Sequence, residues 1–120
     1  MHKPKKSHYE AAIRIVRYIK KNPRQGILLS AAGRPEINAY CDSDWASCSM
    51  TRKSVPGFCI KLGDSLILWK SKKQNTISRS SVEAEYRSMG VTVTELMWIK
   101  GLLSELGVEV TKPMMLHCDS

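Results

Sequence analysis

The chain has 120 residues, of which 42% are hydrophobic, and a formal net charge of +8 at pH 7. This length allows one domain with a real core, and no window reaches the ~18 consecutive apolar residues of a membrane span. No apolar stretch follows the basic start of the chain, which excludes a secretory signal. We therefore expect an intracellular protein, in the cytoplasm or nucleus, with no membrane partner.

The positive charge is concentrated near the N-terminus. Residues 1–26 contain eight Lys or Arg residues and one acid, which gives +7, whereas residues 27–120 contain 11 bases and 10 acids, which gives +1. A cationic segment joined to a nearly neutral remainder suits a polyanionic partner such as nucleic acid. A solvated cationic helix face without a partner would carry the same charges.

An amphipathic helix is predicted close to the N-terminus. Ser7 and Glu10 have the spacing of a capping box, in which the two side chains accept hydrogen bonds from each other's main-chain amides. Apolar residues recur at helical spacing as far as Ile19, and Asn22 followed by Pro23 ends the helix. The apolar face of this helix needs a surface to cover, either in this chain or in a separate domain.

The middle of the chain has the pattern of β-strands. Residues 26–29 are a short strand candidate. Residues 37–45 alternate between two faces, one with Ile37, Ala39 and Cys41 and the other with Tyr40, Asp42 and Asp44. Residues 57–62 and 66–70 flank a short connection that contains a glycine, which favours an antiparallel hairpin.

A long second helix is predicted from Ser80 to Gly107. Ser80 and Glu83 have capping-box spacing, and the glycine ends the helical pattern. Three- and four-residue spacing defines an apolar face with Met89, Val93, Leu96, Met97, Leu103 and Leu106. A last strand at residues 114–118 can return parallel to residues 37–45 through this helical crossover, so the pattern predicts an α/β fold with a mixed sheet.

The four cysteines are interpreted as reduced side chains that act as small hydrophobes. Cys41, Cys59 and Cys118 fall within apolar strand patterns. No two of the four cysteines, the fourth being Cys48, have C-x-x-C spacing. His117 beside Cys118 does not have zinc-finger spacing.

Two glutamates at the start of the second helix are expected to have different roles. Glu83 lies four residues before Arg87, which favours a surface ion pair. Glu85 lies four residues before Met89 on the apolar face, so helical spacing directs it towards the sheet, where a carboxylate is costly unless it is paired or bound to a metal. A helix that begins at a different angle would leave both acids solvated.

Aspartates at two strand ends complete a candidate metal site. Asp42 and Asp44 share one face of a strand, and either can be a ligand, although Asp44 can equally cap the following loop. Asp119 follows the last strand, at the carboxyl edge where α/β sheets often bind ligands. Three acids brought together in this way, with Glu85 as one of them, can hold a hard cation such as Mg²⁺.

Cations and aromatic side chains near the strands suggest contacts with nucleic acid. The polar segments that flank the strands contain five basic residues, Lys53, Lys70, Lys72, Lys73 and Arg79, which we expect to contact phosphates of a bound strand. Tyr40, Trp45 and Trp69 can stack on bases, although aromatics in strands more often belong to the core.

Six short motifs follow one another along the chain. They are Tyr40 to Ala46, Arg52 to Gly57, Trp69 to Gln74, Ser80 to Tyr86, Trp98 with Leu102 to Gly107, and His117 to Ser120. In this order they resemble the ribonuclease H domain of copia-type retrotransposon polyproteins. Residues 7–21 resemble the segment that joins the reverse transcriptase to that domain, so the resemblance covers nearly the whole chain.

The resemblance implies a fold, a domain division and an activity. The implied fold is a ribonuclease H-like mixed sheet flanked by helices, with a connecting helix in residues 1–26 and a partial ribonuclease H-like domain in residues 27–120. The implied activity is hydrolysis of the RNA strand of RNA–DNA hybrids by two Mg²⁺ or Mn²⁺ ions during reverse transcription. Asp42, Glu85 and Asp119 would then be the catalytic, metal-binding acids, and the reverse transcriptase domain of the parent polyprotein a possible partner.

The chain departs from the family at its C-terminal end. The family continues with further helices, another strand and a fourth acid, so we expect a truncated domain with little or no activity alone. A noncatalytic nucleic-acid-binding remnant, driven by the basic N-terminal segment, is the alternative. A relic that does not fold is a third possibility.

Overall fold

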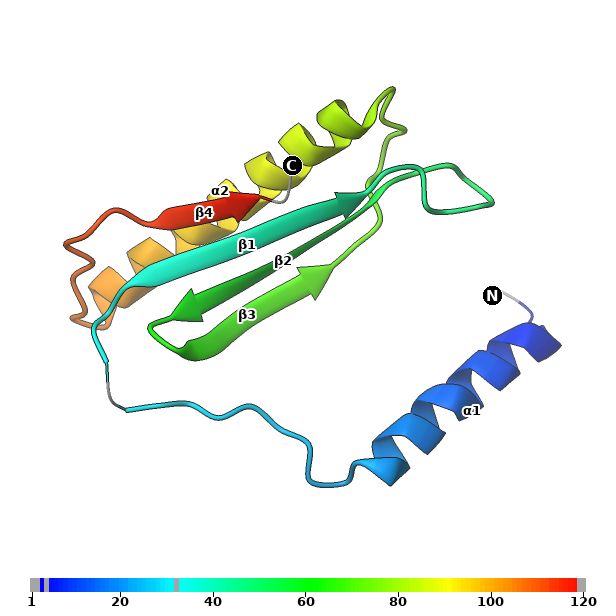
Figure 1. Cartoon of the computed structure of the whole chain (residues 1–120), viewed down its shortest axis with the longest axis horizontal. Helices are drawn as coiled ribbons and strands as arrows, with labels where there is room; N and C mark the ends of the chain where they lie inside the picture. Colours follow the sequence, from blue (N-terminus) through cyan, green and yellow to red (C-terminus); the bar gives the residue numbers. More distant parts are fainter. Residues whose placement is uncertain (1–2, 4, 32, 119–120) are drawn as a thin grey trace.

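The computed structural model describes residues 3, 5–31 and 33–118 of the chain. Two helices and four strands are present in these residues (Figure 1). In chain order they are α1 (Lys6–Lys21), β1 (Ile37–Asp44), β2 (Val55–Leu62), β3 (Ser65–Ser71), α2 (Ser81–Glu105) and β4 (Met115–Cys118). Neither helix, over the residues described, is long and apolar enough to cross a membrane.

The four strands form one mixed sheet in the order β3-β2-β1-β4. β2 pairs antiparallel with β1 and with β3, and β4 runs parallel to β1. The predicted hairpin is confirmed, and its turn uses Gly63, whose φ of +58° favours glycine. The predicted parallel return of the last strand through α2 is confirmed too, so the chain has the expected α/β fold.

The core lies between α2 and one face of the sheet. The alternation predicted for β1 is confirmed, because Ile37, Ala39 and Cys41 are buried on the face that α2 covers. The rest of the core comes from Phe58, Ile60, Leu96, Ile99 and Leu103. In Figure 1, α2 lies behind the sheet, and its first turns are near the carboxyl end of β1.

The buried face of α2 differs from the predicted one. Met89, Leu96 and Leu103 contribute to it as expected, but Val93, Met97 and Leu106 are exposed. The N-terminal half of the helix instead buries small residues: Ala84, Ser88 and Thr92. Hydrophobic spacing cannot identify such a face, because two of its residues are polar and become buried only when their hydroxyls donate to main-chain carbonyl oxygens.

The N-terminal segment departs from prediction in two places. α1 begins at Lys6, so the capping box expected from Ser7 and Glu10 is wrong, and the imidazole of His8 accepts a hydrogen bond from the Lys5 amide instead. The predicted strand at residues 26–29 is absent. A strand needs a partner, and residues 26–29 pair with none of the four strands of the sheet.

α1 stands apart from the rest of the fold. None of its residues is buried, and it contacts no other helix or strand in the described part of the chain. Asn22 ends α1 as predicted, and the described residues between it and β1 contain no helix or strand (Figure 1). The four-stranded sheet and α2 therefore form their core without α1.

Candidate functional site

The first candidate acid lies near the carboxyl end of β1. The side chain of Asp42 is exposed on the sheet face opposite the core, and its Oδ1 accepts a hydrogen bond from the Ser43 amide over 2.7 Å. The main-chain carbonyl oxygen of Asp42 accepts a hydrogen bond from the hydroxyl of Ser88 over 3.1 Å. This contact joins the end of β1 to α2. Asp44, the last residue of β1, is exposed.

Glu85 lies one helical turn before Ser88, at the margin of the buried face of α2. It is half-buried, and it has no hydrogen-bond or ion-pair partner among the residues that the structure describes. Residues three apart on a helix are neighbours on its surface. Because Ser88 touches the main chain of Asp42, the turn of α2 that bears Glu85 adjoins the carboxyl end of β1.

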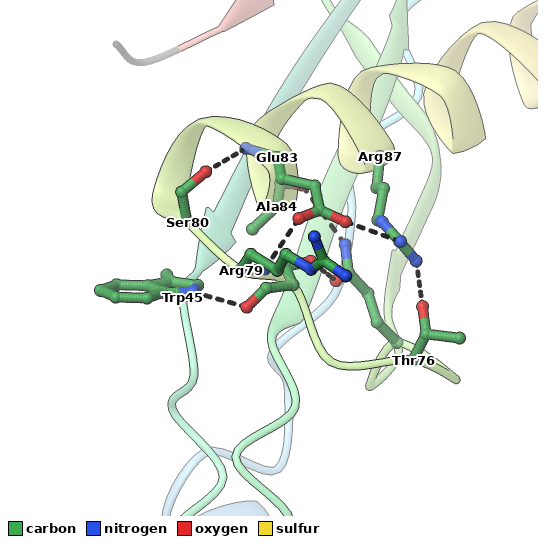
Figure 2. A network of polar contacts seen from close by, with 9 residues as sticks. Trp45, Thr76, Arg79, Ser80, Glu83, Ala84 and Arg87 are labelled. Atoms are coloured by element: carbon green, nitrogen blue, oxygen red, sulfur yellow. Dashed lines mark hydrogen bonds and ion pairs between the residues drawn. The ribbon is translucent and has the colours of Figure 1, made fainter.

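Glu83 organises the start of α2 (Figure 2). Its amide donates to the Ser80 hydroxyl over 3.2 Å, and its carboxylate accepts from the Arg79 amide over 2.8 Å and from Arg87 over 2.7 Å. The predicted cap by Ser80 and the predicted Glu83–Arg87 pair are thus confirmed. The reciprocal half of the predicted capping box is wrong, because Glu83 accepts from the Arg79 amide and not from the Ser80 amide. The Arg79 amide, and then the Arg87 guanidinium, lower the pKa of Glu83 below its ordinary value. This network fixes the helix that carries Glu85.

The link before α2 is held by the same network. Arg87 also donates to the hydroxyl of Thr76, and the indole N–H of Trp45 donates to the Ser78 carbonyl oxygen over 3.1 Å (Figure 2). The side chain of Gln74 accepts from the Ser78 hydroxyl and donates to the Ala84 carbonyl oxygen. The segment that leads from β3 to α2 is therefore anchored at both of its ends.

The third candidate acid, Asp119, lies outside the described residues. Cys118, which precedes it in the sequence, is paired in register with Cys41, which precedes Asp42. The two cysteines are free thiols with their sulfur atoms 2.9 Å apart. Burial, followed by the contact with Cys118, raises the pKa of Cys41 to about 12.

The donor atoms of this region suit a hard cation. Asp42 and Glu85 supply carboxylate oxygens, the ligands that Mg²⁺ and Mn²⁺ prefer. In the described part of the chain, no three His, Cys, Asp or Glu side chains are grouped so that they could hold a metal ion. Of the three candidate acids, the described residues contain Asp42 and Glu85.

Three of the five predicted nucleic-acid-binding residues come together. Lys70, Lys72 and Lys73 line a cleft of about 670 Å³ between α2 and the ends of β2 and β3. Arg79 is exposed and Lys53 is half-buried, and neither lines this cleft. Sequence reasoning missed Arg87 as a fourth cation of the cleft, because its spacing from Glu83 accounted for it as an ion-pair partner.

The aromatic side chains near the strands are mostly on the surface. Tyr40 stacks on His117 of β4 with ring centroids 4.7 Å apart, and Trp69 belongs to the same cross-strand row of the sheet. Tyr40, Trp45 and Trp69 are 44%, 49% and 56% exposed. The interpretation of these residues as core residues is therefore wrong, because the sheet face opposite α2 has no covering element among the described residues.

Comparisons with known proteins find similar segments in transposon polyproteins and in an effector protein. The retrovirus-related Pol polyprotein from transposon RE1 of Arabidopsis thaliana is 42% identical over 120 residues, all of this chain and 8% of that protein. The corresponding polyprotein from transposon TNT 1-94 of Nicotiana tabacum is 34% identical over 117 residues, 98% of this chain and 9% of that protein. Secreted RxLR effector protein 161 of Plasmopara viticola is 33% identical over 96 residues, 80% of this chain and 68% of that protein.

These similarities cover all elements of the fold. No protein-family model and no solved structure matches the chain. The chain spans about 8% of the length of the RE1 polyprotein, so it corresponds to a small segment of such a protein. The expected kinship with copia-type polyproteins is confirmed. Over its whole length the chain is thus similar to a segment of retrovirus-related Pol polyproteins of transposons.

Proposed function

We propose that this chain is the ribonuclease H segment of a transposon Pol polyprotein. In this proposal its activity is metal-dependent hydrolysis of the RNA strand of RNA–DNA hybrids during reverse transcription. Asp42, Glu85 and Asp119 would hold Mg²⁺ or Mn²⁺. The observation that carries the proposal is the hydrogen bond from Ser88 to the Asp42 carbonyl oxygen, because it sets the turn of α2 that bears Glu85 against the end of β1 that bears Asp42.

The strand topology supports the same site. β1 and β4 are parallel neighbours, and each of the paired residues Cys41 and Cys118 is followed in the sequence by an aspartate. Two metal ions, when bound, would activate water and stabilise the leaving oxygen of a phosphodiester. The chain contributes exposed carboxylate oxygens on Asp42, and on Glu85 a carboxylate without a competing partner among the described residues.

Metal binding and hybrid cleavage test this function together. Binding of Mn²⁺ to the purified chain would be followed by electron paramagnetic resonance, and cleavage of a labelled RNA–DNA hybrid would be measured in Mg²⁺. We expect Asp42→Asn and Glu85→Gln to lose Mn²⁺ binding and any cleavage. Asp64→Asn is the matched control, because Asp64 is an exposed acid in the β2–β3 turn, away from the site.

Two results would contradict the proposed function. A chain that unfolds cooperatively, binds no Mn²⁺ and leaves the hybrid intact would contradict the proposal, as would Mn²⁺ binding that survives both site substitutions. Far-UV circular dichroism of each variant would separate loss of the site from loss of the fold.

A noncatalytic nucleic-acid-binding role is the second candidate. It is favoured by the cleft beside α2, whose lining contains Lys70, Lys72, Lys73 and Arg87 and no carboxylate. A role of this kind predicts binding to hybrids and to plain duplexes alike, with a steep dependence on salt. Binding that does not change with salt would exclude it.

A further inference from the structure

The cleft beside α2 combines two kinds of surface. Its floor is apolar, with Pro56 and Phe58 from β2 and Val91 from α2. Four cations line the same cleft: Lys70, Lys72, Lys73 and Arg87. Its volume of about 670 Å³ is within the range of small-molecule sites, and it can accommodate a group of the size of a nucleotide.

The basic side of the cleft is held in place by main-chain contacts. The amide of Lys72 donates to the Pro56 carbonyl oxygen over 3.2 Å, and the amide of Gln74 donates to the Ser54 carbonyl oxygen over 2.8 Å. Arg87 is held by Glu83 and by Thr76, as Figure 2 shows. A preorganised site of this kind loses less conformational freedom when a ligand binds.

The cleft adjoins the main chain near the carboxyl end of β1. Ser88 lines it and also donates to the carbonyl oxygen of Asp42. Phe58, on the floor, is paired in register with Cys41, the residue before Asp42. A strand bound in the cleft would lie on the α2 side of the sheet, whereas the carboxylate of Asp42 lies on the opposite face.

We propose that this cleft binds one unpaired strand of nucleic acid, with a base on the apolar floor and the adjoining phosphates on the cations. The proposal goes beyond the function given above, whose substrate is a paired RNA–DNA hybrid, because it assigns the cleft to an unpaired strand. A duplex offers phosphates at its surface but keeps its bases stacked inside, so it would leave the floor unused. An unpaired strand offers both a phosphate and an apolar base face.

Gly90 allows a test that leaves the charge unchanged. Gly90 lines the cleft, and a Cβ added there meets no atom within 4 Å, so Gly90→Leu fills the cleft without a backbone clash. Gly101→Leu is the matched control, because Gly101 also lies in α2 in open space but does not line the cleft. Both changes replace a helical glycine and favour the helix to a similar extent.

The probe is a fluorescein-labelled oligothymidylate of ten nucleotides, titrated by fluorescence anisotropy without divalent cations. We expect Gly90→Leu to weaken binding about tenfold, the loss of roughly one base contact, and Gly101→Leu to bind like the unaltered chain. A blunt duplex of equal length should bind both variants equally. Unchanged oligothymidylate affinity in a cooperatively folded Gly90→Leu chain would overturn the proposal, and so would an equal loss for strand and duplex.

Substitution of a cation in the cleft provides a second, independent test of the proposal. Lys72→Gln should reduce the slope of log binding constant against log salt concentration by about 0.7, the effect of one lost phosphate contact. Lys100 is an exposed lysine of α2 outside the cleft, so Lys100→Gln should leave this slope unchanged. An equal effect of the two substitutions would count against the cleft. Because no metal is present, failure of the carboxylate site would leave these binding results unaltered, so the two proposals can fail separately.

Discussion

The hydroxyl of Ser88 donates a hydrogen bond over 3.1 Å to the carbonyl oxygen of Asp42, a residue 46 positions away in the sequence. Ser88 is 2% exposed, so its hydroxyl has little access to water as an alternative partner. The bond fixes the position of α2 along the direction of β1. It thereby determines how close the turn with Glu85 lies to the end of β1.

Replacing Ser88 should therefore destabilise the fold. Ser88→Ala removes the donor and leaves a small hole in the buried face, and we expect it to lower the free energy of unfolding by about 1–2 kcal/mol. Ser104→Ala, on an exposed position of the same helix, should change it by less than about 0.5 kcal/mol. Urea denaturation followed by circular dichroism measures both, and equal stabilities would show that the bond is dispensable.

Truncation of two neighbouring residues of α2 should affect the free energy of unfolding to very different extents. Leu96 is 4% exposed and belongs to the core, whereas Met97 is 58% exposed. Leu96→Ala should lower the free energy of unfolding by about 2–4 kcal/mol because it leaves a cavity. Met97→Ala should stay within about 0.5 kcal/mol of the unaltered chain. A large loss for Met97→Ala would mean that the helix packs through the face predicted from hydrophobic spacing.

The contrast between Leu96 and Met97 shows where prediction from the sequence ends. Alternation located β1, the glycine turn located the hairpin, and the long helix required a parallel return of β4, since each of these depends on neighbours in the chain. The buried face of α2 depends on Ser88 and Thr92, which become core residues only through carbonyl partners. A prediction from the spacing of apolar residues passes over these two polar residues and assigns exposed residues such as Val93 and Met97 to the buried face.

In the candidate site, too, local features could be predicted from the sequence and contacts between distant segments could not. Asp42 and the Glu83–Arg87 pair could be predicted, because a strand end and a four-residue helical spacing are local features. The approach of Ser88 to Asp42 and the pairing of Cys41 with Cys118 could not, because each joins distant segments whose register only the folded sheet determines. Arg87 was understood as the partner of Glu83, and its second role in lining the cleft depends on where α2 lies on the sheet.

The capping network at the start of α2 should make stability depend on pH. The pKa of Glu83 is lowered from its ordinary value of 4.5 by the Arg79 amide and by Arg87. Its stabilising contribution is therefore present in full above pH 4.5 and is lost as the pH falls through the lower, folded-state pKa. Glu83→Gln should be less stable than the unaltered chain at pH 7, and the difference should close on acidification.

A helix cap without a titrating group serves as the control for this pH dependence. Ser80→Ala removes the hydroxyl that accepts from the Glu83 amide, and the cost should be about 1 kcal/mol at neutral pH. Most of that cost should persist at pH 3, because the serine does not titrate. Chemical denaturation at pH 7, 5 and 3 would measure both variants. A Glu83→Gln deficit that stays constant over this range would show that the carboxylate charge has no part in the cap.

The four thiols should differ in reactivity, with Cys48 and Cys41 at the two ends of the order. The hydroxyl of Thr51, followed by nearby main-chain amides, lowers the pKa of Cys48 to about 6, whereas burial is the main reason that the pKa of Cys41 is about 12. The thiolate is the reactive form, so iodoacetamide at pH 7 should modify Cys48 first and Cys41 last, as peptide mass spectrometry can show. Thr51→Val removes the main donor and should move the half-maximal rate at Cys48 to higher pH, while Thr111→Val, at an exposed position elsewhere, should not. Faster labelling of Cys41 than of Cys48 in the folded chain would mean that the core opens readily, because Cys41 is buried on the sheet face that α2 covers.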